Sequence, residues 1–188
     1  KMSPTLLSKR LKELEWHGIL KRVESPMGSR KSEYVLTQAG IELFDVINAI
    51  GSWGKRWIDM RHNLDSAKEN LLIWDIRRNL RMEYFPINSA VLQINITDVP
   101  KKTSNWWFIF DGKEKPDVGY LDPSLDVDLY IETSLSSLTK VWLGESPLAT
   151  ESKAGTLQIE GSQKMIETFE SWFGVNNFAA IPKFSVAS

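Results

Sequence analysis

The pattern in residues 3–40 constrains the fold of this chain more than any other stretch. It begins with a helix start signal, because Ser3 is a favourable N-cap and Pro4 suits the first helical position. Three leucines at helical spacing, Leu7, Leu11 and Leu14, then form one apolar stripe. Gly18 ends the helix, since glycine readily takes the positive φ found after helix C-termini. We therefore expect an amphipathic helix at the start of the chain.

A β-hairpin is expected directly after this helix. Residues 19–24 and 31–36 read as two strands, and residues 25–29 between them have the proline, glycine and serine typical of turns. Thr37 is placed to cap a following helix. A helix with a polar, basic outer face followed by a basic-tipped hairpin is the layout of a winged helix-turn-helix DNA reader.

The order of residues in this stretch supports the same interpretation. SPTLLSKRLKELEWHGILKR followed by EYVLTQAG resembles the HxlR-type winged helix transcriptional regulators in order and spacing. The resemblance implies a DNA-binding domain that works as a homodimer. Domains of this family normally have further helices upstream of the recognition helix, whereas the given sequence begins at Lys1. We therefore expect the upstream helices to be missing here, and the leucine stripe to lack a closed core.

The charge distribution indicates where DNA would bind. Residues 1–31 hold eight basic and three acidic residues, whereas the whole chain has a net charge of −1. A basic end on a near-neutral chain is the electrostatic pattern expected where phosphate is held; the alternative is an ordinary solvated surface. The predicted contacts to double-stranded DNA are Ser3, Thr5, Ser8, Lys9, Arg10, Lys12, Arg22, Ser29, Arg30 and Lys31.

A long apolar helix, or a broken pair of helices, is predicted over residues 38–61. Its stripe consists of Ile41, Phe44, Ile47, Ile50, Trp53, Trp57 and Met60. This is more apolar surface than the edge of a small winged domain needs. We expect residues 41–60 to form a homodimer interface, as in the resembled family; the alternative is that the stripe packs on the rest of its own chain.

The chain after a boundary at residues 64/65 changes character. A helix to about residue 82 is followed by alternating strands at 87–97, 106–110, 118–121 and 126–132, then by helices and one more strand at 156–160. One closing helix is expected from Ser162 through Phe173. Trp106 and Trp107 are adjacent in a strand, so only one ring can face inward, and we interpret that ring as core. This order predicts an α+β domain with an antiparallel sheet covered on one face.

A second resemblance covers roughly residues 66–180. DVDLYIETSLSSLTKVWLGESPLATESKAGTLQIEGSQKMIETFESWF is similar to sterol carrier protein type 2 domains. This similarity implies an apolar, lipid-sized tunnel between sheet and helices, and no catalysis by the domain alone. The residues expected to line the tunnel are Phe108, Phe110, Leu129, Ile131, Leu138, Val141, Trp142, Met165 and Phe169.

The rest of the composition excludes several classes of function. The chain has no cysteine, no apolar run long enough to span a membrane, and no recognisable catalytic, phosphate-binding or metal-binding motif. We expect a cytoplasmic protein that is not an enzyme and has no cofactor or bound metal.

These patterns together predict a two-domain transcriptional regulator whose residues 65–188 sense an apolar small molecule. Two alternatives remain open. The C-terminal domain could be a packed assembly module without a ligand, or the protein could transfer lipids and use its winged domain to bind a partner.

Overall fold

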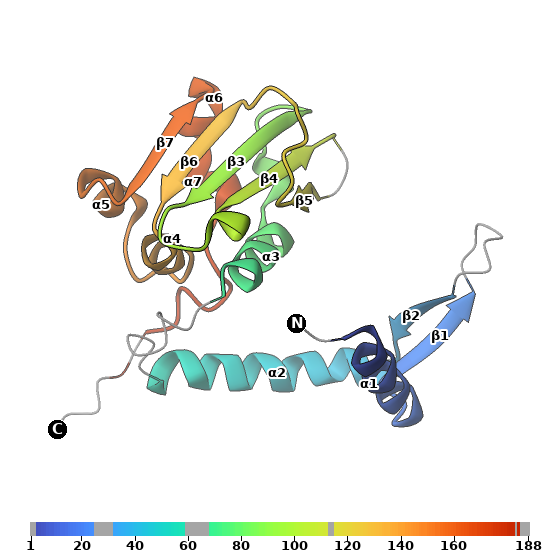
Figure 1. Cartoon of the computed structure of the whole chain (residues 1–188). Helices are drawn as coiled ribbons and strands as arrows, with labels where there is room; N and C mark the ends of the chain where they lie inside the picture. Colours follow the sequence, from blue (N-terminus) through green and yellow to red (C-terminus); the bar gives the residue numbers. More distant parts are fainter. Residues whose placement is uncertain (1–2, 25–31, 59–67, 113–114, 183, 185–188) are drawn as a thin grey trace. The chain divides into compact units, whose positions relative to one another are not determined.

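The computed structural model describes residues 3–24, 32–58, 68–112, 115–182 and 184. The chain divides into two compact units, Lys1–Arg56 and Trp57–Ser188 (Figure 1). The expected boundary at 64/65 lies outside the described residues.

The first unit consists of a helix, a hairpin and a long helix. Helix α1 (Pro4–Trp16) begins as predicted, with the Ser3 hydroxyl accepting a hydrogen bond from the Leu6 amide at 3.2 Å. Strands β1 (Leu20–Glu24) and β2 (Ser32–Leu36) pair antiparallel, and α2 (Gln38–Trp57) is one continuous helix. The leucine stripe of α1 stays open, since Leu7 is 49% and Leu14 39% exposed.

The hairpin and α2 are joined through Thr37. Its hydroxyl donates to the carbonyl oxygens of Gly18 and Ile19 and accepts from the Gly40 amide at 3.2 Å. Gly40 is buried, and a Cβ at this position would clash with the Ile19 carbonyl. Only glycine therefore lets the first turn of α2 approach the start of the hairpin this closely.

The second unit contains a five-stranded sheet in the order β5-β4-β3-β6-β7. The strands are β3 (Ala90–Ile96), β4 (Asn105–Phe110), β5 (Asp117–Gly119), β6 (Leu129–Thr133) and β7 (Leu157–Gly161). All neighbours are antiparallel except β3 and β6, which run parallel. The expectation of an antiparallel sheet therefore needs one correction: residues 120–128 lead the chain back from the β5 edge to place β6 beside β3.

Helices cover one face of this sheet. The helices are α3 (Glu69–Asn79), α4 (Leu135–Trp142), α5 (Leu148–Lys153), α6 (Gln163–Glu167) and α7 (Phe169–Phe173), with short 3-10 turns η3 (Met82–Tyr84) and η4 (Lys101–Thr103). In Figure 1, α7 lies behind the strands, and α3 and α4 lie at their lower end; residues of all three helices pack in one core with the strands. The expected α+β class is confirmed.

The predicted single closing helix is instead two short helices. The break falls at Thr168, whose φ and ψ are −103° and 6°. The Thr168 hydroxyl donates to the Lys164 carbonyl at 2.8 Å, and the Trp172 indole donates to the Met165 carbonyl at 3.2 Å. The break turns α7 so that Phe169, Trp172 and Phe173 all enter the core, where each is 3% exposed or less.

Candidate functional site

The polar face of α1 is the candidate DNA-contact surface. Thr5, Ser8, Lys9 and Lys12 are all exposed, as their spacing opposite the leucines predicts. Trp16, one helical turn beyond Lys12, lies on the same face and is 87% exposed. Trp16 was not among the predicted DNA contacts, although the same spacing rule identifies it. The face therefore offers hydroxyl groups, two cations and one indole together.

Three of the other predicted DNA contacts already have partners within the chain. Ser3 caps α1, Arg10 forms a 2.8 Å ion pair with Glu13, and Arg22 donates to the Ser32 hydroxyl across the hairpin. The Arg10–Glu13 pair is exposed, so solvent screening leaves it weak and open to exchange for a phosphate. Ser29, Arg30 and Lys31 lie outside the described residues.

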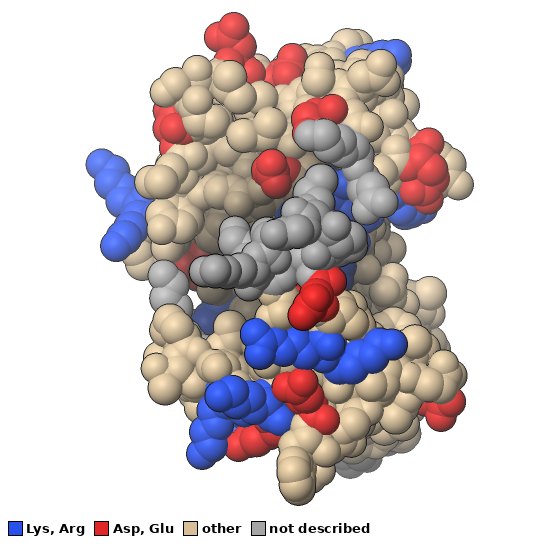
Figure 2. Space-filling view, turned by 90° about the vertical axis from the view of Figure 1, so that its right-hand side faces the viewer, with Lys and Arg blue, Asp and Glu red and all other residues tan. Residues whose placement is uncertain are grey.

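The surface of the winged unit carries both signs of charge. Figure 2 shows lysine and arginine side chains gathered in the lower part of the view, where Figure 1 has α1 and the hairpin. Acidic side chains lie among them. The candidate DNA-contact surface is therefore distinguished by the positions of Lys9 and Lys12, and not by a uniform positive field.

Helix α2 exposes an unusually apolar face. The exposed fractions are 58% for Phe44, 56% for Ile47, 64% for Ile50, 57% for Trp53 and 50% for Trp57. These side chains follow one side of the helix, whereas Asp45, Ser52 and Arg56 lie on the other. Contiguous apolar surface of this kind marks an interaction site. Met60 lies outside the described residues.

The residues predicted to line a tunnel lie in the packed core of the second unit. All nine are buried, with Phe108 and Leu129 fully shielded from solvent. Aromatic rings fill the space between sheet and helices: Phe85 stacks on Phe110 at 4.1 Å, and Phe169 on Phe173 at 4.5 Å between ring centroids. The inner face of the sheet thus packs directly against its helices.

An apolar pocket of about 310 Å³ lies at the end of this core. Its walls come from the end of α4, the turn into α5, and α7 with the residues after it. Of the nine predicted residues, Val141 and Phe169 border this pocket. The structure adds Leu148, Phe173 and Val175, which no sequence pattern separated from ordinary core residues. The volume is at the lower end of the range of small-molecule sites.

Glu151 supports the turn that forms one wall of this pocket. Its carboxylate is buried and accepts a hydrogen bond from the Thr156 hydroxyl at 2.7 Å. Hydrogen bonds from the hydroxyls of Ser146, Thr156 and Ser137, helped by the nearby Lys140 charge, outweigh burial and lower the pKa of Glu151. Because Ser146 lines the pocket, the ionised Glu151 stabilises the pocket wall.

Asp75 connects the other side of the pocket to α3. Its carboxylate accepts hydrogen bonds from the Trp142 indole at 2.7 Å, the Asn176 side chain at 2.8 Å and the Asn79 side chain at 3.1 Å. Trp142 follows the pocket residue Val141, and Asn176 follows Val175. One carboxylate on α3 therefore fixes two segments of the pocket wall.

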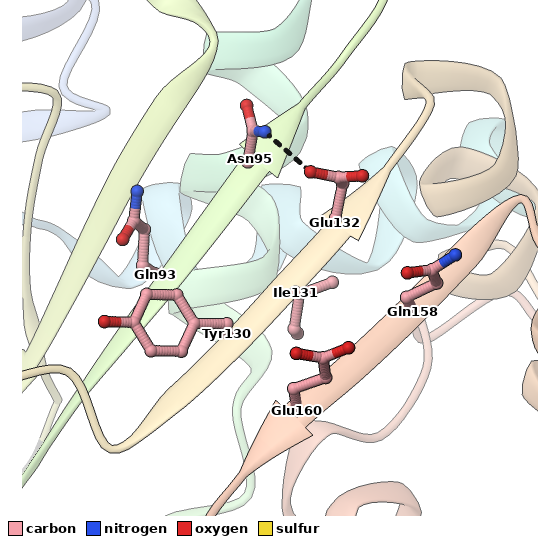
Figure 3. A pocket seen from close by; sticks show the side chains of 7 residues that line it. All are labelled: Gln93, Asn95, Tyr130, Ile131, Glu132, Gln158 and Glu160. Carbon is pink, nitrogen blue, oxygen red and sulfur yellow. Dashed lines mark hydrogen bonds between the residues drawn. The ribbon is translucent and has the colours of Figure 1, made fainter.

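The uncovered face of the sheet has a different chemistry. A hollow of about 270 Å³ there is lined mainly by amides, carboxylates and a tyrosine from β3, β6 and β7 (Figure 3). Asn95 donates to Glu132 at 3.2 Å, and Gln93 donates to Asn105 at 2.9 Å. Such a polar face disfavours apolar ligands. The described part of the chain contains no grouping of three or more side chains suited to holding a metal.

The comparisons with known proteins separate the two units. Residues 1–62 match the sequence model of the family described as HxlR-like helix-turn-helix. A curated relative, the uncharacterized HTH-type transcriptional regulator YvaP of Bacillus subtilis (strain 168), is 41% identical over 58 residues. These residues are 31% of this chain and 54% of that protein, so the chain spans about half of its relative. The winged unit is thus an HxlR-like helix-turn-helix domain, as its sequence predicts.

Solved structures similar to the remainder include sterol carrier protein domains. The sterol carrier protein domain 2 of Helicoverpa armigera is 12% identical, with a TM-score of 0.43, and covers 63% of this chain and 89% of its own. Sterol carrier protein 2 like 2 from Aedes aegypti is 14% identical, with a TM-score of 0.39. The match covers 55% of this chain and 98% of that protein. The sec-alkylsulfatase Pisa1 from Pseudomonas sp. is 18% identical, with a TM-score of 0.40. The match covers 54% of this chain and 15% of that protein.

No helix in the described ranges combines the length and the apolar content that a bilayer crossing requires.

The lowered pKa of Glu151 gives the second unit a defined pH dependence. The ionised form is favoured in the folded state, so its contribution is complete above the ordinary glutamate pKa of about 4.3 and is lost as pH falls through the lower folded pKa. We expect Glu151→Gln to lower the free energy of unfolding at pH 7 and to reduce its decline toward pH 3. Urea unfolding at several pH values measures both effects. Glu167→Gln, on an exposed helix position, is the control; equal pH profiles for wild type and Glu151→Gln would contradict the assignment.

Proposed function

We propose that the protein is a DNA-binding transcriptional regulator whose second unit binds an apolar small molecule. The observation that carries the first part is the exposed face of Thr5, Ser8, Lys9 and Lys12 on the helix of an HxlR-like domain. Lysines neutralise backbone phosphates, and short hydroxyl side chains near the helix N-terminus approach base edges. A regulator of this kind works in the cytoplasm, where the DNA is.

The apolar face of α2 supports a homodimer. A second copy of α2 is the occupant with the same apolar chemistry, and a two-fold pair of winged domains matches two half-sites on DNA. The dimer would place two α1 helices on one duplex. Burying Ile50, Trp53 and Phe44 against a partner removes large apolar side chains from water, which is favourable in proportion to the area covered.

The apolar pocket beside α4 and α7 supports ligand binding by the second unit. Its walls are mostly aliphatic and aromatic, with Ser146 and Glu170 as polar groups at the side. This lining suits a fatty acyl chain better than a charged metabolite. The hydrogen bonds of Asp75 link the pocket to α3, the first described helix after the winged unit, and so offer a route for coupling.

Two alternatives are kept because specific observations favour them. The densely packed aromatic core favours an assembly module that binds nothing. The resemblance to lipid carriers favours a transfer protein whose winged unit binds a partner. Direct measurements of DNA, self-association and ligand binding distinguish the three.

DNA binding is tested at Lys9 and Lys12. We expect Lys9→Ala and Lys12→Ala each to weaken binding to all sequences and to reduce the salt slope by about one unit, because each removes one phosphate contact. Fluorescence anisotropy at several salt concentrations measures both quantities. Lys153→Ala, which removes a charge from the second unit, is the matched control. Unchanged slopes for both α1 variants would exclude this face from the interface.

Self-association is tested at Ile50. Ile50→Glu places a charge in the middle of the apolar face, and we expect it to convert a dimer to a monomer at micromolar concentration. Ser52→Glu adds the same charge on the other side of α2, away from the apolar face, and should leave the dimer intact. Light scattering gives the mass of each variant. A monomeric wild-type protein would refute the dimer.

Ligand binding is tested at Val175, a 45% exposed residue of the pocket wall. Fatty acids, acyl thioesters and sterols are titrated by calorimetry, and we expect at least one class to bind saturably. Val175→Asp should raise its Kd about tenfold or more, because an apolar chain would desolvate the carboxylate. Leu125→Asp, at an exposed position that does not line the pocket, is the control. If no class binds and the purified protein carries no lipid, the assembly module replaces this proposal; lipid exchange between vesicles would favour the transfer protein.

A further inference from the structure

A second cleft lies at the β4–β5 edge of the sheet, away from the apolar pocket. Its volume is about 340 Å³, and its lining combines α3, β4, β5 and the residue Leu121. Trp74 and Leu121 are 45% and 75% exposed, so large apolar side chains border the cleft in contact with water. Neither the DNA-contact surface nor the apolar pocket uses these residues.

A guanidinium group is held in place inside this cleft. The Arg77 guanidinium carbon lies 5.5 Å from the centroid of the Trp74 ring, and Nε donates to the Pro116 carbonyl at 2.6 Å. Stacking on an indole and a backbone hydrogen bond together fix the plane of the group. The two terminal amino groups carry further N–H donors in the fork geometry that matches a carboxylate.

A glycine stands opposite a tryptophan in the lining of this cleft. Trp107 pairs with Gly119 across β4 and β5, and its ring is 9% exposed although it lies on the face opposite Trp106. Gly119 has no side chain to fill the space beside this ring. A Cβ built at Gly119 would meet no atom nearer than 4.0 Å, so the space is open and the backbone tolerates a side chain.

These groups define one class of ligand. The exposed indole of Trp74 favours a flat aromatic molecule, and the oriented guanidinium of Arg77 favours a carboxylate on it. Asp117 also lines the cleft and can accept a hydrogen bond from a ring hydroxyl or ring N–H. We propose that this cleft binds a small aromatic carboxylic acid that carries a ring donor, with its carboxylate on Arg77 and its ring against Trp74, in the open space beside Gly119.

The test uses the full chain and isothermal titration calorimetry. The probes are 4-hydroxybenzoate and indole-3-carboxylate, with cyclohexanecarboxylate and 4-hydroxybenzamide as controls that lack the aromatic ring and the charge. We expect the aromatic acids to bind at least about tenfold more tightly than either control. No binding of either acid at millimolar concentration, or equal binding of cyclohexanecarboxylate, would overturn the proposal.

Substitutions assign the binding to this cleft. Arg77→Gln should weaken binding about tenfold or more, whereas Arg78→Gln, on the exposed neighbouring position of α3, should not change it. Gly119→Val should abolish binding by filling the cleft, and circular dichroism should show an unchanged fold. Val175→Asp, in the other pocket, should leave aromatic acid binding intact. Binding that survives both Arg77→Gln and Gly119→Val, or that is lost in Val175→Asp, would refute the assignment.

Discussion

The two-residue alternation of the central strands is the constraint on which the second unit depends. In β3, Leu92, Ile94 and Ile96 are fully shielded, while Gln93 and Asn95 between them face the other way. Strand β6 repeats this pattern, with Leu129 and Ile131 inward and Tyr130 and Glu132 outward. Because a one-residue slip would exchange the two faces, this pattern fixes the register. It also determines which face the helices cover and which face carries Gln93, Asn95 and Glu132.

Because the covered face of the sheet is densely packed, the spaces large enough for a ligand lie at the borders of this face. Phe108, Phe110 and Trp172 occupy the centre, where a void would cost free energy in proportion to its size. The apolar pocket then lies where α4 and α7 end, and the cleft that contains Arg77 lies at the β4–β5 edge of the sheet. Both contact segments that hydrogen-bond to α3, through Asp75 in one case and Arg77 in the other. Helix α3 is thus the element that either ligand would influence directly.

Local chemistry was predictable from the sequence, and long-range pairing was not. The Ser3 cap of α1 and the exposed, polar side of the same helix follow from residue type and spacing within one or two turns. The parallel pairing of β3 with β6 leaves no such signal, because alternation is the same for either strand direction. The pocket lining was hard to predict for a related reason. Apolarity selected nine candidates, but the same property places a side chain in the core, and Val141 and Phe169 are the two that border the apolar pocket.

The contact between Thr37, Gly40 and the end of α1 has a mechanical consequence. Because the Thr37 hydroxyl and the Gly40 backbone join α2 to Gly18 and Ile19, we expect the hairpin to turn with α2 as one arm. Twenty helical residues make this arm about 30 Å long. A rotation of a few degrees at its C-terminal end becomes a displacement of ångströms at the winged end. In a pair of chains joined through α2, such a lever would set the distance between the two α1 helices and thereby their fit to successive turns of one duplex.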